Sequence, residues 1–231
     1  MKRTRHIKCL HPYIFSLPND LVLEILARVA ASSFTDILNA KLSCKFLNEI
    51  ANNDYIYQQV SLEKVPVIPW WPNKQTSSFL DRCKKSGNVE ALYRQGVIEY
   101  LSACNLESGL MYLRMATNSG HLGASYVLGV VLLCNNDDDE EGINFLNIVH
   151  NNVQGFEECR QQLQEVTTCL WFNNYLVPKP NNCLMQNEHL KKQRGWPTDN
   201  ENVIQCEACR CHREIKFVCS LCSHGEKFYN Y

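Results

Sequence analysis

The sequence SLPNDLVLEILARVAASSFTDILNAKLSCKFLNEI, residues 16–50, contains two apolar patterns that repeat with the period of an α-helix. Pro18 suits the first turn of a helix, because it has a fixed φ and no backbone donor. Thr35 or Asp36 can cap a second helix. The two apolar faces consist of Leu21, Val22, Ile25, Leu26 and Val29, and of Leu38, Leu42, Phe46 and Ile50. So short a stretch cannot cover both faces by itself, so they must pack against the rest of the chain or against a partner.

The order of particular residues in this stretch resembles the F-box, over roughly residues 16–60. The match consists of Leu17-Pro18-Asn19-Asp20-Leu21-Val22, Glu24-Ile25-Leu26, Asp36-Ile37-Leu38 and Leu42-Ser43-Cys44-Lys45-Phe46-Leu47. Two features differ from the usual pattern: a longer connection over 29–34, and Phe46 where Trp is commoner. The resemblance implies docking onto the Skp-type adaptor of a cullin–RING ubiquitin ligase. The residues it implies for that contact are Leu17, Pro18, Leu21, Val22, Ile25, Leu26 and Leu47.

Length and composition limit the classes of protein that fit. The 231 residues allow one or two domains, and the 45% hydrophobic and 20% charged content is that of a folded soluble protein. A net charge of −1 gives no reason to expect binding to nucleic acid or to an anionic membrane. No apolar run approaches membrane-spanning length, and no hydrophobic signal-peptide region follows the basic residues 1–5. These observations favour a cytoplasmic or nuclear protein.

From Ser86 onward the chain repeats itself at a fixed offset of 33 residues. The matching pairs are Gly87 and Gly120, Ala91 and Ala124, Tyr93 and Tyr126, Gly96 and Gly129, Gly109 and Gly142, and Leu113 and Leu146. A fixed offset predicts stacked pairs of helices. Glycine inside a helix costs about 1 kcal/mol relative to alanine, so its recurrence indicates close packing where two helices cross.

Two fragments of this region, Ser119-Gly120-His121 and Ala124-x-Tyr126-x-Leu128-Gly129, resemble the Sel1-like repeat, a relative of the tetratricopeptide repeat. The resemblance covers roughly residues 80–150 and implies a scaffold that binds another protein. The alternative is that the helices only support the F-box and cap each other, because short repeat stacks need caps at both ends.

The segments around these units complete a mainly α fold. Three prolines between residues 66 and 72, around Trp70-Trp71, forbid a continuous helix there. Apolar residues at helical spacing within 155–175 predict a helix that caps the repeats, and residues 177–182 then break regular structure. The predicted divisions are an F-box at 16–60, a Pro/Trp linker at 61–78, helical repeats with the capping helix at 79–176, a linker at 177–203 and a cysteine-rich tail at 204–231.

The tail holds a cluster of cysteines typical of a metal site. The chain has 13 cysteines, an odd number, so reduced thiols and metal ligands are expected in place of a disulfide framework. Cys206-x-x-Cys209 and Cys219-x-x-Cys222 can complete a tetrahedron around Zn²⁺. The run 215–218 has the character of a short strand, so the tail is predicted to be a small zinc-ribbon-like β unit. Competing ligands are Cys211, His212 and His224, and the alternative without metal is a hairpin with reduced cysteines.

The order of F-box, repeats and cysteine-rich tail resembles a group of plant F-box proteins. It implies a non-catalytic adaptor subunit that joins the Skp-type protein, and through it the cullin and RING subunits, to an unknown protein substrate. One alternative is a zinc-dependent protein that binds nucleic acid through Arg210, His212, Arg213 and Lys216, although the tail is only weakly basic. Another is a scaffold with a vestigial F-box. An enzyme is the least supported, since phosphate-loop, nucleophile-elbow and catalytic metal motifs are missing from the sequence.

Overall fold

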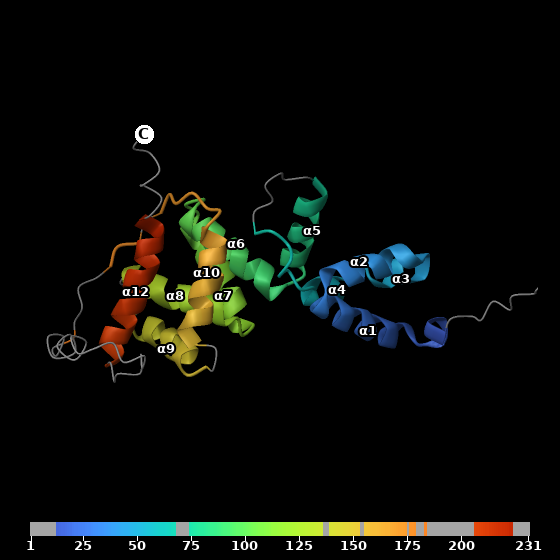
Figure 1. The fold of residues 1–231 in the computed structure, drawn as a ribbon, viewed down its shortest axis with the longest axis horizontal. Coiled ribbons are helices and arrows are strands. Elements are labelled where there is room, and N and C mark those ends of the chain that lie inside the picture. Colours follow the sequence, from blue (N-terminus) through green and yellow to red (C-terminus); the bar gives the residue numbers. More distant parts are fainter. Residues whose placement is uncertain are drawn as a thin grey trace, which may run out of the picture. The chain divides into compact units, whose positions relative to one another are not determined.

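The computed structural model describes residues 13–67, 74–135, 139–152, 155–174, 176–178, 183 and 206–223, and the statements below concern these residues. The chain divides into two compact units, Met1–Asn88 and Val89–Tyr231. All regular structure in the described ranges is helical (Figure 1), which confirms the prediction of a mainly α fold.

The described part of the first unit consists of a short 3-10 turn followed by five helices. These elements are η1 (Tyr13–Ser16), α1 (Asn19–Ser32), α2 (Phe34–Ser43), α3 (Lys45–Ile50), α4 (Asp54–Gln59) and α5 (Lys74–Lys85). Pro18 is the N-cap of α1. Its missing backbone N–H costs nothing there, because the first N–H groups of a helix have no partner within the helix. The second predicted helix is in fact two, because Cys44 is extended (φ −160°, ψ 159°) and ends α2 before α3 begins. Ser33, and not Thr35 or Asp36, caps α2, since its hydroxyl accepts a hydrogen bond from the Asp36 amide at 3.3 Å.

Asn88 closes the first unit. Its buried side-chain amide donates to the backbone carbonyls of Tyr57, Gln58 and Val60 at 3.1, 3.0 and 2.8 Å. These are the carbonyls at the end of α4, which have no partner within that helix. One polar side chain therefore ties the end of α4 to the residues that follow α5.

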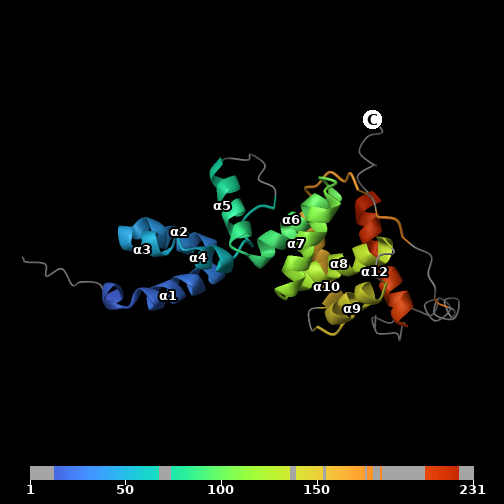
Figure 2. The ribbon, with the colours of Figure 1, turned by 180° about the vertical axis from the view of Figure 1, so that it is seen from behind.

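In its described residues, the second unit contains two helix pairs, a covering helix and one further helix near the C-terminus. They are α6 (Val89–Leu101), α7 (Leu106–Asn118), α8 (Leu122–Asn135), α9 (Asp139–His150), α10 (Gly155–Thr167) and α12 (Glu207–Ser223). The pairs α6–α7 and α8–α9 are the two predicted repeats. The residues from Gly123 to Leu133 are all buried, so α8 is the centre of the core. Figure 2 shows the unit from behind, with α10 and α12 beside α8.

The recurrent glycines inside the helices, Gly96, Gly109, Gly129 and Gly142, lie where the two helices of each pair cross. A Cβ atom on Gly109 would lie 2.7 Å from the Tyr100 amide nitrogen, and one on Gly142 would lie 3.0 Å from the carbonyl oxygen of Gly129. Any side chain would force the backbones apart at these points. The packing role predicted for these glycines is confirmed.

The Ser119-Gly120-His121 motif forms the junction between the repeats. Gly120 has φ +86°, a left-handed conformation that glycine adopts without a steric penalty. The His121 ring accepts a hydrogen bond from the Ala124 amide at 3.0 Å, in the first turn of α8. The same ring stacks on Tyr93 at 4.5 Å and bonds Glu90 at 3.0 Å, both from α6. The motif thus caps one repeat against the other.

Helix α10 lies in the segment that was predicted to cap the repeats. Its apolar side buries Phe156, Leu163 and Val166, and the helix packs on α8 and α6. The following residues return to the end of α6, where the backbone amides of Asn173 and Asn174 donate to the Leu101 carbonyl at 3.0 and 3.1 Å.

The predicted β character of the tail is wrong. Residues 215–218 lie in the middle of α12, and no strand occurs in the parts of the chain that the structure describes. Cys211, Ile215, Val218 and Cys222 are all buried, at steps of four, three and four residues. This is the spacing of one face of a helix, and it packs against α8. Cysteines acting as apolar core residues, together with their helical period, determine the structure of this segment.

Candidate functional site

Helix α1 presents an exposed apolar face. Leu17, Leu21 and Ile25 are spaced four residues apart, so they lie along one side of the helix and its entry. Leu21 is 52% exposed and Ile25 is 43% exposed, so exposed apolar side chains are grouped on this side of the helix and are not scattered singly. On α2, Leu38 is also exposed and Leu42 is 84% exposed. We call these five residues, Leu17, Leu21, Ile25, Leu38 and Leu42, the α1–α2 apolar face.

The structure divides the residues that the sequence assigned to adaptor binding. Leu17, Pro18, Leu21 and Ile25 are exposed, and Leu47 on α3 is partly exposed. Val22 and Leu26 are 0% and 3% exposed, because they point into the core of the first unit. Adjacent positions on a helix differ by about 100° in direction, so Leu21 and Val22 cannot face the same way.

Two of the residues predicted for adaptor binding, Val22 and Leu26, are thus core residues, and the exposed leucines also include Leu38 and Leu42, which the prediction did not name. The four-residue spacing of these two leucines, already visible in the sequence, was the available signal.

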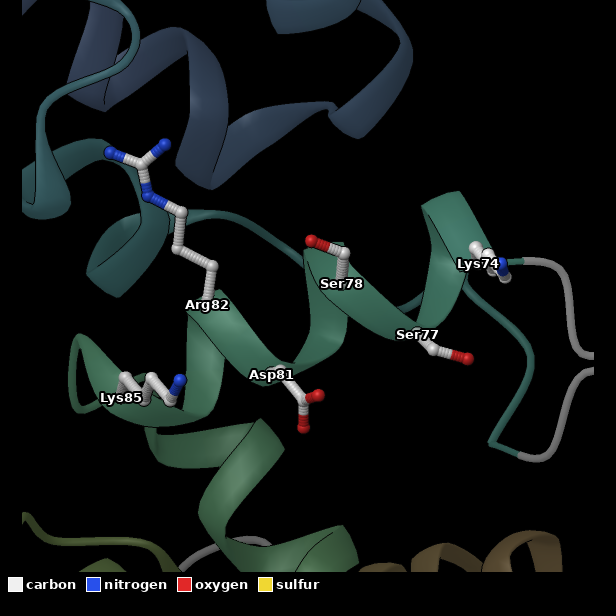
Figure 3. A pocket seen from close by; sticks show the side chains of 6 residues that line it. All are labelled: Lys74, Ser77, Ser78, Asp81, Arg82 and Lys85. Carbon is white, nitrogen blue, oxygen red and sulfur yellow. The ribbon is translucent and has the colours of Figure 1, made fainter.

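A polar hollow lies along α5 in the first unit. It has a volume of about 540 Å³ and is lined by Lys74, Ser77, Ser78, Asp81, Arg82 and Lys85 (Figure 3). Arg82 points away from Asp81 toward α4, where its guanidinium bonds Asp54 at 3.2 Å and lies 4.1 Å from the centre of the Tyr57 ring. Its charge thus holds α5 to α4, and the hollow is a feature of helix packing.

A fully buried carboxylate, Glu214, fixes α12 to the second unit. Arg160 of α10 donates to both of its oxygens, at 2.8 and 2.6 Å, and the Tyr126 hydroxyl of α8 donates to it at 3.2 Å. The hydrogen bonds to Glu214 raise the pKa of Arg160. Burial is the main cause that raises the pKa of Tyr126 far above its ordinary value, and the negative charge of Glu214 is the next. Sequence reasoning missed this cluster, because its three residues are far apart in the chain.

Three cysteine sulfurs meet at the start of α12. The Sγ atoms of Cys183, Cys206 and Cys209 all lie within 4.8 Å of one another, and those of Cys183 and Cys206 are 3.3 Å apart. A hydrogen bond from the Cys209 backbone amide is the main cause that lowers the pKa of the Cys206 thiol. Three thiols at this spacing could hold a metal ion. We call them the three-cysteine cluster.

The predicted set of four zinc ligands is not brought together. Cys206 and Cys209 lie at the start of α12, and Cys219 and Cys222 lie near its end. Even the nearest two, Cys209 and Cys219, are about 15 Å apart along the helix at 1.5 Å per residue. The Cys219 thiol bonds Cys134 of α8, which lowers its pKa. Burial raises the pKa of Cys222 to about 11, and that of Cys211 to about 11 as well.

Of the competing ligands named from the sequence, Cys211 and His212 lie within α12 and His224 lies outside the described residues. No pattern in the sequence pointed to Cys183, which lies 23 residues before Cys206.

Two known families match this chain, one over the F-box helices and one over the repeats. Residues 14–63 match the family described as F-box-like, and residues 62–168 match the family of plant tetratrico peptide repeats. The Arabidopsis thaliana F-box protein At2g35280 is 30% identical over 125 residues, which are 54% of this chain and 76% of that protein. The chain belongs to the F-box proteins. The F-box match spans η1 to α4 and the repeat match spans α5 to α10, so the three-cysteine cluster lies outside both matches.

Two further relatives of this F-box protein are also from Arabidopsis thaliana. At1g67623, which is named as an F-box protein, is 30% identical over 168 residues, 70% of this chain. The F-box protein At1g67340 is 31% identical over 118 residues, 50% of this chain. The chain spans 56% of the length of the first and 31% of the second. No solved structure matches the chain. Among the described helices, none has the length and apolar character needed to cross a membrane.

Proposed function

We propose that this F-box protein is a substrate-recognition subunit of an SCF-type (Skp–cullin–F-box) ubiquitin ligase, which docks on a Skp-type adaptor through the α1–α2 apolar face. The observation that carries the proposal is the exposure of Leu21 and Ile25 on a helix whose other side, with Val22 and Leu26, is already buried. Such a face is covered favourably when a partner removes it from water. The match to the F-box family over the same helices supports a Skp-type partner.

In this proposal the chain itself makes and breaks no covalent bond. It holds a protein substrate close to the ubiquitin-loaded enzyme and raises the effective concentration of a substrate lysine. The first unit supplies the affinity for the adaptor, and through it for the cullin and RING subunits. The second unit supplies the contact with the substrate.

The surface that we assign to the substrate lies on the second helix of each repeat. Met115 of α7 and Ile148 of α9 occupy the same position in the two repeats, and both are exposed, as is Met111 one turn before Met115. Arg114 and Glu141 join α7 to α9 through two hydrogen bonds of 2.6 and 2.9 Å. Methionine adapts its shape to a partner easily, which suits a recognition surface.

The test is binding of the full chain to a purified Skp-type protein, measured by calorimetry. The double variant Leu21→Ala/Ile25→Ala should bind about 100-fold more weakly, because truncating two central apolar residues of an interface costs about 3 kcal/mol. The fold should change little, since both side chains are exposed in the free chain.

The matched control is Leu106→Ala/Ile148→Ala, which removes the same two residue types at 42% and 54% exposure from the second unit. The control should bind the adaptor as the unchanged chain does. Equal affinity for all three proteins would contradict docking through the α1–α2 apolar face. No binding by the unchanged chain would contradict the whole proposal and favour a scaffold with a vestigial F-box.

A further inference from the structure

We propose that Cys183, Cys206 and Cys209 bind a thiophilic divalent cation, Zn²⁺ in the cell, which joins the chain at Cys183 to the first turn of α12. This is a ligand set of three cysteines at one end of the helix. Cys219 and Cys222 take no part in it.

The geometry of the three-cysteine cluster suits zinc. In a tetrahedral site with Zn–S bonds of about 2.3 Å, neighbouring sulfurs lie about 3.8 Å apart. The cluster is compatible with this value, since one separation is 3.3 Å and none exceeds 4.8 Å. The three sulfurs can occupy three corners of the tetrahedron around one ion.

The chain provides the three sulfurs from two separate places. Cys206 immediately precedes α12 and Cys209 is its third residue, so both sulfurs lie at the first turn. Cys183 reaches the same point from 23 residues earlier in the chain. A metal ion that joins two positions far apart in the sequence restricts the unfolded chain more than the folded one. The unfolded state therefore loses more entropy, and the folded state becomes more stable.

The surroundings of the cluster favour bound thiolates. The first turn of a helix offers unpaired backbone N–H groups and the positive end of the helix dipole, and both offset negative charge. The three cysteines are partly exposed, so an ion can reach them. Three thiols cannot all be satisfied by one disulfide bond, whereas one metal ion can bind all three.

Helix α12 has a separate attachment, which makes the proposal testable without loss of the fold. Glu214 is bonded to Arg160 and Tyr126 two turns along the helix, and Asn147 of α9 bonds Glu207 and Arg210 at 2.6 Å each. Removal of one cysteine should therefore release the metal and leave the helices of the second unit in place.

The experiment measures metal content in the full chain, co-purified with its adaptor where needed and kept reduced. The unchanged chain, loaded with ZnCl₂ and desalted, should retain about one zinc per molecule by mass spectrometry, since one such cluster holds one ion. Cys183→Ser and Cys206→Ser should each retain less than a tenth of it, with unchanged helical circular dichroism. Loading with Co²⁺ should give a thiolate charge-transfer band that Cys183→Ser removes.

Matched controls are Cys219→Ser and Cys222→Ser at the other end of α12, and Cys169→Ser at an exposed position of the same unit. All three should keep the zinc. The proposal is overturned if the unchanged chain holds no zinc, if Cys219→Ser or Cys222→Ser releases it as Cys206→Ser does, or if the reduced preparation contains a Cys183–Cys206 disulfide. Adaptor binding through the α1–α2 apolar face is measured separately, so failure of one proposal leaves the other intact.

Discussion

Glu214 shows how a single residue can hold an element in place. Its carboxylate has no contact with solvent and is bonded by Arg160 and Tyr126, which belong to α10 and α8. A buried carboxylate is costly in isolation, so its value depends on every partner being present. The cluster therefore defines where α12 packs more sharply than apolar contacts alone could do.

We expect Glu214→Ala to lower the free energy of unfolding by about 3 kcal/mol, because it leaves the Arg160 guanidinium without its partner inside the protein. Urea denaturation followed by circular dichroism measures the change. The double variant Arg160→Met/Glu214→Leu removes both charges together and should recover most of the loss. If the single and double variants were equally unstable, the loss would come from packing and the electrostatic explanation would be wrong.

At the scale of the element, the helix pairs depend on backbones that nearly touch. A Cβ atom added at Gly109 would meet the amide nitrogen, Cβ and Cα of Tyr100 first, at 2.7, 2.8 and 2.9 Å. Backbone atoms in a packed helix cannot move aside without moving the helix. The α6–α7 pair is thus sensitive to one methyl group.

Gly109→Ala should destabilise the second unit by about 1–3 kcal/mol, the cost of overpacking, even though alanine favours the helix. Gly123→Ala is the matched control, since its Cβ would meet side chains and no backbone: Oε1 of Gln162, the end of a flexible side chain, at 2.6 Å, and the His121 ring at 3.1 Å. The control should change stability by less than about 1 kcal/mol. Thermal unfolding of both variants gives the comparison, and an equal effect of the two would show that the close approach of α6 and α7 is not limiting.

Two helices show how far the sequence could predict the site. In α1 the apolar face was too wide for its own unit, so exposure of Leu21 and Ile25 could be predicted. Which of two neighbours, such as Leu21 and Val22, is buried depends on which side of α1 packs on α4. The period of the apolar residues alone does not determine that side.

In α12 the Cys-x-x-Cys spacing fits a tight turn and also one turn of a helix, so it could not decide between them. The β-branched residues around Phe217 favoured a strand, and packing against α8 overrode that local preference. Counting Cys211 and Cys222 as apolar would have revealed the helical period. Cys183 could not be predicted, because only tertiary structure brings it to Cys206.

At the scale of the whole molecule, the two units have separate cores, and the proposed functions are divided between them in the same way. The α1–α2 apolar face belongs to the first unit, while the repeats and the three-cysteine cluster belong to the second. A ligand that binds one folded unit stabilises that unit by mass action. The response to the adaptor should therefore differ between the units.

Hydrogen exchange of the full chain, with and without a Skp-type protein, tests this division. At an adaptor concentration about 100 times the dissociation constant, the free energy of unfolding of the first unit should rise by about 2.7 kcal/mol. Amides of α1 that exchange through unfolding of this unit should therefore exchange about 100-fold more slowly. Amides of α8, in the core of the second unit, should keep their rates, because no adaptor contact is proposed there. At the same adaptor concentration, Leu21→Ala/Ile25→Ala, which should bind about 100-fold more weakly, should leave only about twofold protection of α1. Protection that appeared first in α8, or that stayed at about 100-fold in the double variant, would place the adaptor on a different surface from the one that Leu21 and Ile25 form.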